Sequence, residues 1–113
     1  MHEFSLAIEV INLAAREAEK NKVKTVQEIT IEVGDLSGVE ADAFESALAL
    51  LVKDSILDQA NIQIIRIPGK GKCIACDYGF EMNHRMATCP KCNCFPSEIN
   101  GGEDFRVVSL LAE

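Results

Sequence analysis

The sequence predicts an α+β protein in which a three-stranded sheet packs against two helices and carries an inserted zinc-ribbon-like module with four cysteine ligands. Two segments have apolar residues at helical spacing, and three short runs have strand composition. Four paired cysteines fall between the second and third of those runs. The 113 residues suffice for one small core plus a module that needs help from a metal to fold.

A first helix is expected from Phe4 to about Lys20. Its inner stripe is predicted from apolar residues that recur at steps of three and four, namely Phe4, Ile8, Ile11, Ala15 and Ala18, and it is widened by Leu6, Val10 and Leu13. Lysines on either side of Asn21 follow, as is typical of a helix end. The helix therefore begins almost at the first residue.

Three strands and a second helix complete the predicted core. Residues 28–33 alternate strictly, which places Ile29, Ile31 and Val33 on one buried face. Residues 61–67 are rich in isoleucine, and residues 105–111 return to strand composition. The second helix is expected over about 40–53, with an inner stripe of Phe44, Ala47, Leu48 and Leu51.

The cysteine-rich region divides the chain into two predicted domains. Apolar periodicity stops at Pro68-Gly69 and returns after Asn100-Gly101-Gly102, so these two segments are the expected hinges. Residues 1–68 plus 101–113 are expected to form the α/β domain. Residues 69–100 are expected to form the zinc-binding module.

The four cysteines form two Cys-x-x-Cys pairs separated by twelve residues, Cys73 with Cys76 and Cys89 with Cys92. Two tight turns at this spacing present four thiolates to one tetrahedral ion, and Zn²⁺ suits an all-sulfur tetrahedron. The paired spacing favours metal ligation over disulfides. Such a closed site is structural, because a catalytic zinc needs an open position. The fifth cysteine, Cys94, is either a spare thiol or a partner in metal exchange or redox chemistry.

The amino terminus carries a second candidate metal site. The α-amine of Met1, the backbone nitrogen of His2 and the His2 ring can close fused chelate rings around one ion. Flat, nitrogen-rich coordination selects Ni(II) or Cu(II). Two alternatives stay open on these residues alone. His2 is also explained as a solvated residue, and Glu3 as an acid that favours a helix N-terminus.

Charge excludes several function classes. With 18 acidic and 11 basic residues the net charge is −7, which opposes nucleic acids and anionic membranes. The cysteine-rich module is nearly neutral once a zinc centre with four thiolates is counted, so it lacks the basic patch of a nucleic-acid-binding ribbon. No apolar run suits a membrane span or signal peptide, and a cytoplasmic location is expected. No nucleophile–base pair or phosphate loop points to an enzyme.

Four segments resemble the HypA/HybF family of nickel metallochaperones, which mature nickel–iron hydrogenases. They are MHEFSL at residues 1–6, GDLSGV at 34–39, the PG pair at 68–69 and FRVVSL at 105–110. The resemblance spans essentially the whole chain. It implies Ni(II) binding by Met1, His2 and Glu3, with structural zinc on the four paired cysteines. It also implies a nickel-handling GTPase and a hydrogenase large-subunit precursor as partners, and urease maturation proteins as further candidates.

The resemblance leaves three residues with open roles. Glu40 is an auxiliary nickel-ligand candidate or an ordinary acid in the first turn of a helix. His84 is a second auxiliary candidate or an exposed loop histidine. Relatives commonly follow the last cysteine with Gly or Ser, whereas this chain has Asn93-Cys94, so Cys94 inherits no role. The alternative function is a zinc-ribbon adaptor that binds protein or nucleic acid, with His2 incidental.

Overall fold

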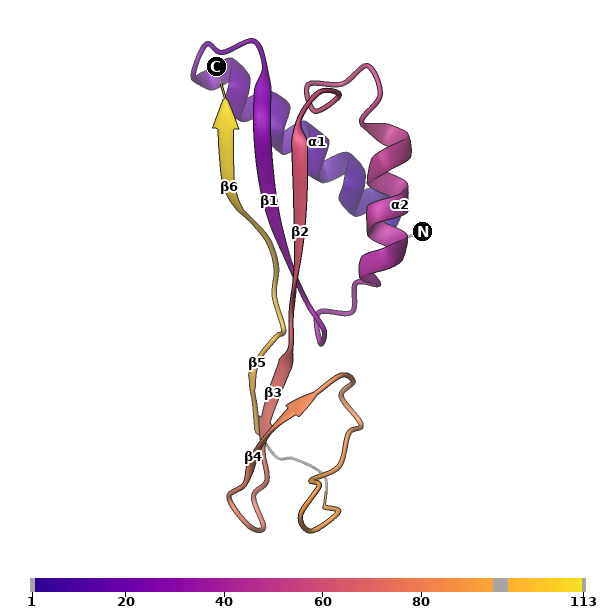
Figure 1. Cartoon of the computed structure of the whole chain (residues 1–113), viewed down its shortest axis with the longest axis vertical. Helices are drawn as coiled ribbons and strands as arrows, with labels where there is room; N and C mark the ends of the chain where they lie inside the picture. Colours follow the sequence, from indigo (N-terminus) through magenta and orange to yellow (C-terminus); the bar gives the residue numbers. More distant parts are fainter. Residues whose placement is uncertain (1, 95–97, 113) are drawn as a thin grey trace. The chain divides into compact units, whose positions relative to one another are not determined.

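Two helices and two three-stranded sheets make up the part of the chain that the structure describes, residues 2–94 and 98–112 of a computed structural model (Figure 1). The predicted α+β class is confirmed. The elements in order are α1 His2–Lys20, β1 Val26–Gly34, α2 Ala41–Leu51, β2 Asn61–Ile67, β3 Gly69–Lys72, β4 Gly79–Met82, β5 Glu98–Gly101 and β6 Phe105–Ala112.

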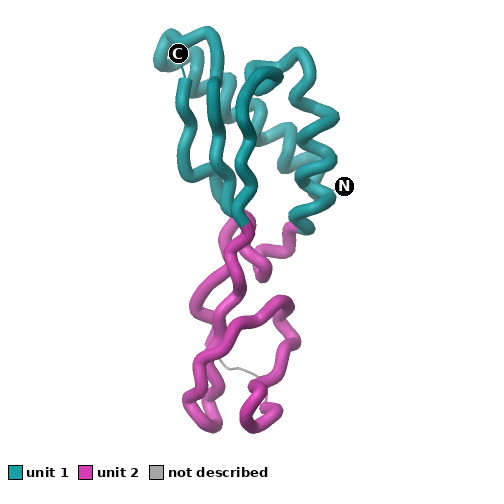
Figure 2. Tube along the Cα trace, in the orientation of Figure 1, with its two compact units in different colours: residues 1–32, 40–65, 106–113 teal, residues 33–39, 66–105 magenta. Residues whose placement is uncertain are grey.

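The backbone divides into two compact units (Figure 2). The first unit comprises residues 1–32, 40–65 and 106–113, and the second comprises 33–39 and 66–105. The short segment 33–39, which includes the last two residues of β1 and leads toward α2, thus belongs to the same unit as the cysteines. The domain bounds expected from sequence stay a prediction.

The larger sheet has the strand order β2-β1-β6, with α1 and α2 packed against each other on one side of it (Figure 1). The buried face predicted for β1 is confirmed, because Ile29, Ile31 and Val33 are buried, and Thr30 between them is buried as well. The inner stripe predicted for α2 is confirmed at its centre, where Phe44 and Leu48 are buried. Arg106 of β6 donates to the Glu32 carboxylate of β1 at 3.1 Å.

The inner stripe predicted for α1 is wrong at Phe4, Ile8 and Ala15, which are exposed, and is confirmed at Val10 and Ala18, which are buried. The buried residues are Ala7, Val10, Ala14 and Ala18, whereas Phe4 and Ile8 are 36% and 46% exposed. Both sets have helical spacing, so periodicity cannot choose between the two faces. Small side chains let a helix axis approach its neighbours closely, and three of the four buried positions are alanines.

The second unit is built on the small antiparallel sheet β4-β3-β5, which the sequence did not predict. Strand β3 reads Gly-Lys-Gly-Lys and has no apolar alternation to detect. Its glycines admit neighbouring side chains: a Cβ at Gly69 would lie 2.5 Å from Leu36 Cγ, and one at Gly71 would collide with the Met82 sulfur. Leu36 and Met82 are both buried, so they form the core of this unit.

Backbone hydrogen bonds hold segment 33–39 within the second unit. The N–H groups of Gly34, Asp35 and Leu36 donate to the carbonyls of Asp104, Ile67 and Gly102 at 2.8, 2.9 and 2.7 Å. The Arg85 guanidinium adds a bond to the Leu36 carbonyl at 2.9 Å and another to the Glu103 carboxylate at 3.1 Å. The resemblance segment Gly34–Val39 is therefore part of the cysteine-bearing unit.

Candidate metal centres

The sulfur atoms of the four paired cysteines gather at one point in the second unit. The Sγ atoms of Cys73, Cys76, Cys89 and Cys92 all lie within 4.8 Å of one another. The Cys73–Cys92 and Cys76–Cys89 distances are 3.3 and 3.6 Å. Sulfurs about 2.3 Å from a tetrahedral zinc are separated by about 3.8 Å. The cluster therefore fits a four-coordinate ion with only small adjustments.

The two cysteine pairs have equivalent backbone turns. The N–H of Cys73 donates to the carbonyl five residues later, and so does the N–H of Cys89, at 3.0 and 2.8 Å. Each cysteine carbonyl also accepts the N–H four residues later, from Asp77 and Asn93 respectively, at 2.8 Å in both turns. Each pair is therefore a closed turn that presents its two sulfurs on the same side.

The residue after each cysteine pair has a positive φ, which explains why an asparagine follows the last paired cysteine. Asp77 and Asn93 have φ of 64° and 63°, and Asp and Asn tolerate this region better than other non-glycine residues. Asn93 thus fills a position suited to glycine. Cys94 follows with an exposed side chain, and its carbonyl accepts the Cys89 N–H. In this structure Cys94 therefore helps to close the second turn through its backbone carbonyl.

Hydrogen bonds to sulfur differentiate the four thiols. The Cys76 N–H lowers the pKa of Cys73. Burial raises the pKa of Cys89, but N–H bonds from Cys92 and Lys91 outweigh it and bring the pKa down to about 7. The Cys94 N–H lowers the pKa of Cys92. The neighbouring thiols and burial raise it by more, so the pKa lies above its ordinary value. The Tyr78 N–H lowers the pKa of Cys76, but burial and contacts with the Cys89 and Cys73 thiols raise it above its ordinary value, so the pKa values of the four thiols are pushed in two directions.

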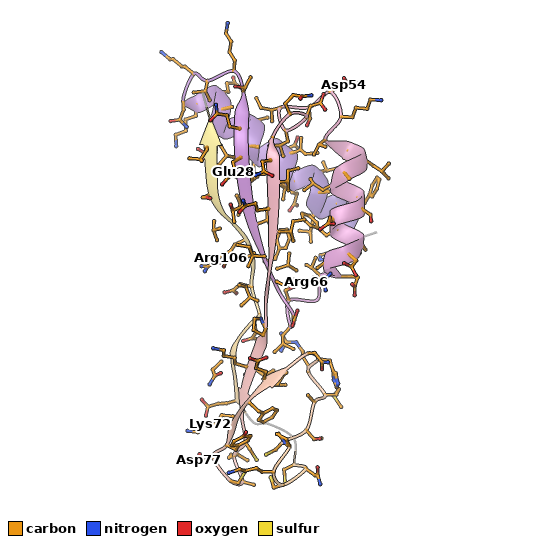
Figure 3. All side chains as sticks on the ribbon, viewed as in Figure 1. Glu28, Asp54, Arg66, Lys72, Asp77 and Arg106 are labelled. Atoms are coloured by element: carbon orange, nitrogen blue, oxygen red, sulfur yellow. The ribbon has the colours of Figure 1, made fainter. Side chains whose placement is uncertain are left out.

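Polar and aromatic contacts frame the first turn. Lys72 and Asp77 lie beside each other, with Nζ 3.4 Å from Oδ1 (Figure 3). The Lys91 ammonium lies 4.7 Å from the Tyr78 ring centroid, and the rings of Tyr78 and Phe80 stack at 6.4 Å. The second turn is thereby tied to the first through Lys91 and Tyr78.

The candidate nickel residues lie in the first unit, except that Met1 falls outside the described residues. His2 opens α1 and is exposed. The neighbouring Glu3 carboxylate accepts the backbone N–H of Glu40 at 3.2 Å. This bond lowers the pKa of Glu3. Glu3 and Glu40, which are 37 positions apart, thus meet at the start of α2.

Glu40 itself is the N-cap of α2, and its side chain makes no capping hydrogen bond. Glu40, the auxiliary nickel-ligand candidate, is therefore held next to Glu3 by its backbone N–H. His84 lies in the second unit, in the segment between β4 and the second cysteine pair, and its side chain is exposed. No local pattern in the sequence indicates the Glu3–Glu40 bond, because only tertiary structure joins the two.

Within the described part of the chain, no helix is both long and apolar enough to cross a membrane.

Comparison with known proteins gives consistent matches. The family described as hydrogenase/urease nickel incorporation, metallochaperone, HypA matches residues 1–112. The hydrogenase maturation factor HypA of Francisella philomiragia is 40% identical over 98% of both chains. The factor of the same name in Geobacter metallireducens is 34% identical over the full length of both. The solution structure of the nickel metallochaperone HypA from Helicobacter pylori covers 97% of this chain and 96% of its own, with a TM-score of 0.64 and 24% identity.

The matches and the folded cysteine cluster define a nickel-incorporation metallochaperone, a maturation factor and not a catalytic enzyme. The chain belongs to the HypA family. The resemblance stated from the sequence is confirmed.

Proposed function

We propose that the chain binds one Ni(II) through Met1, His2 and Glu3 and passes it to a nickel–iron hydrogenase large-subunit precursor. The hydrogen bond from the Glu40 N–H to the Glu3 carboxylate carries this proposal, because it fixes the residue next to His2 while His2 stays exposed. Family membership supplies the metal and the pathway, hydrogenase or urease nickel incorporation.

The helix start suits backbone coordination. Because α1 begins at His2, the N–H groups of His2 and Glu3 are among the four that have no acceptor inside the helix. Nitrogen ligation there disrupts no helical hydrogen bond. The His2 ring completes a flat nitrogen set that selects Ni(II) over Zn²⁺. An exposed terminal site also suits a carrier, because the ion must leave as well as bind.

The four paired cysteines hold zinc in this proposal, and the zinc is structural. The near-tetrahedral sulfur spacing supports it, as do the two equivalent closed turns. The proposed nickel-binding domain comprises residues 1–68 plus 101–113, and the proposed zinc-binding module comprises residues 69–100. Glu40 is an auxiliary nickel ligand candidate on the strength of its backbone bond to Glu3, and His84 is a weaker one.

The partners proposed for this chain follow from the family resemblance. A nickel-handling GTPase assists transfer, and urease maturation proteins are further recipients. The work takes place in the cytoplasm, where paired thiols stay reduced.

Extension of the amino terminus tests the nickel site. The untagged chain should bind one Ni(II) in addition to its zinc, because the free α-amine is a ligand. Two added residues before Met1 should abolish nickel binding and leave the zinc content unchanged. The same two residues added after Glu113 are the matched control and should change neither. An amino-terminally extended protein that binds nickel like the control would favour the adaptor alternative.

A further inference from the structure

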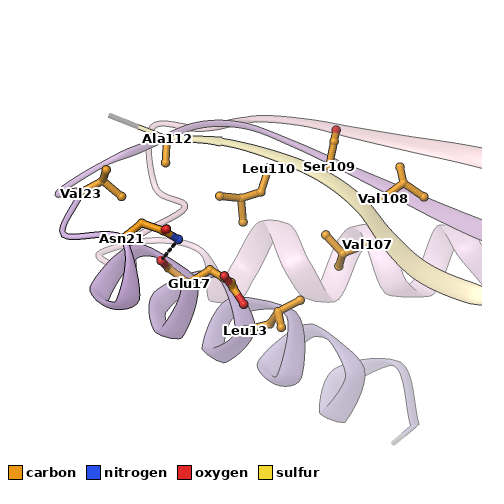
Figure 4. Close-up of a pocket in the computed structure, with 9 residues that line it drawn as sticks. All are labelled: Leu13, Glu17, Asn21, Val23, Val107, Val108, Ser109, Leu110 and Ala112. Carbon is orange, nitrogen blue, oxygen red and sulfur yellow. Dashed lines mark hydrogen bonds between the residues drawn. The ribbon is translucent and has the colours of Figure 1, made fainter.

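A groove separates the second half of α1 from the last strand, β6, within the first unit (Figure 4). Its volume is about 520 Å³. Leu13 and Glu17 line it from the helix, and Val107, Val108 and Leu110 line it from the strand. Most of the lining residues are apolar, Asn21 and Ser109 are polar, and Glu17 is the charged one.

The strand beside this groove has an unprotected edge. In the order β2-β1-β6 no other described strand pairs with the outer side of β6. Residues 107–112 read Val-Val-Ser-Leu-Leu-Ala, with no charge and no proline, and Val108 and Leu111 are 41% and 56% exposed. Proteins usually protect such edges with lysine, proline or bulges, because unpaired N–H and C=O groups recruit another strand. An unprotected edge next to an apolar groove suits strand addition.

The charge of the groove indicates what kind of strand fits. Glu17 lies on the helix wall opposite β6, and the whole chain has a net charge of −7. Lys22 and Lys24, in the turn that follows α1, are exposed and do not line the groove. A second copy of this chain has the same net charge of −7, so the two copies repel each other at long range. Charge complementarity therefore favours a different protein whose segment carries a basic residue.

We propose that the groove receives an extended segment of another protein, which pairs with the free edge of β6 as a fourth strand. Alternate side chains of that segment are apolar and fill the groove, and one basic side chain faces Glu17. Glu17 lies about 22 Å along α1 from His2 at helical rise. A partner anchored here leaves the nickel residues uncovered.

A synthetic strand tests the proposal on the full chain. The probe is a capped peptide of alternating threonine and valine with lysine at its centre, and its pair has glutamate there. Amide shifts and hydrogen exchange report where each binds. We expect the lysine peptide to perturb and protect β6, and the glutamate peptide to bind about fivefold or more weakly, the scale of one exposed charge pair.

Matched variants separate strand addition from general charge attraction. Glu17→Lys should reverse the preference between the two peptides. Glu19→Lys makes the same charge change at an exposed position of the same helix end and should preserve the preference. A lysine peptide with N-methyl groups on alternate residues cannot complete the ladder and should not bind.

The proposal is overturned by equal binding of the two charged peptides, by binding of the N-methylated peptide, or by no change along β6 at millimolar peptide. A concentration-dependent dimer with β6 protected would show that the occupant is a second copy, which also refutes it. The peptide measurements use no nickel, so their outcome is independent of the proposed nickel site.

Discussion

Replacement of Gly34 by alanine probes how segment 33–39 is held in the cysteine-bearing unit. The Gly34 N–H donates to the Asp104 carbonyl at 2.8 Å. A Cβ on Gly34 would collide with the Gly102 carbonyl and lie 2.9 Å from the Asp104 oxygen. These are backbone atoms, so no rotation of a side chain relieves the overlap, and the two backbone segments must separate.

The expected cost follows from the contacts that separate. Two hydrogen bonds are affected, Gly34 N–H to Asp104 at 2.8 Å and Leu36 N–H to Gly102 at 2.7 Å. Their loss costs about 2 kcal/mol, and the added methyl group costs a further ~1 kcal/mol as overpacking. The free energy of unfolding should therefore fall by about 3 kcal/mol.

Urea unfolding followed by circular dichroism measures this change, and amide exchange at Leu36 locates it. Gly79→Ala is the matched control, because the nearest atom to a Cβ there is the Gly71 oxygen at 4.0 Å. Its free energy of unfolding should change by less than about 0.5 kcal/mol. If both variants unfold at the same urea concentration, the reasoning about this backbone contact is refuted.

Three further predictions concern the metal sites. Cys76→Ser should lower zinc content and exchange protection in β3 to β5 while sparing α1 and α2, because a structural site supplies about 10 kcal/mol of apparent binding energy; full zinc occupancy would contradict the assignment. Bound Ni(II) should be low-spin and diamagnetic, and its affinity should fall as the pH falls, because the nitrogen ligands must lose protons to bind the ion; a six-coordinate paramagnetic spectrum would exclude backbone nitrogen ligands. In the metal-free protein, the Glu40 N–H lowers the pKa of Glu3, so this contact stabilises the fold above the ordinary glutamate range and is lost as pH falls through the lowered pKa. Carboxyl NMR should show Glu3 titrating below that range, and an ordinary midpoint would mean that the contact is absent in solution.

Several features of the fold were predictable because they depend on local pattern. Strict alternation identified Ile29, Ile31 and Val33 as buried, and these residues are buried. The cysteine spacing predicted one four-sulfur cluster, and the four Sγ atoms gather within 4.8 Å. Both signals are short-range, so the sequence carries them without knowledge of the tertiary fold.

Features that depend on tertiary contacts were not predictable. Phe4 and Ile8 of the predicted α1 stripe are exposed, because burial depends on which face packs closely, and that face is occupied mostly by alanines. The β3 strand has no apolar pattern, and its glycines matter only because Leu36 and Met82 lie against them. The bond between Glu3 and the Glu40 N–H joins residues that only folding brings together.

The metal content of His2→Ala tests the nickel site most directly. The His2 side chain is exposed, so its loss should change the free energy of unfolding by less than about 0.5 kcal/mol. Equilibrium dialysis against micromolar Ni(II), followed by elemental analysis, should find one nickel and one zinc per untagged chain. His2→Ala should retain the zinc and no nickel, while His84→Ala should retain both. A His2→Ala protein that still holds one nickel under these conditions would contradict the account.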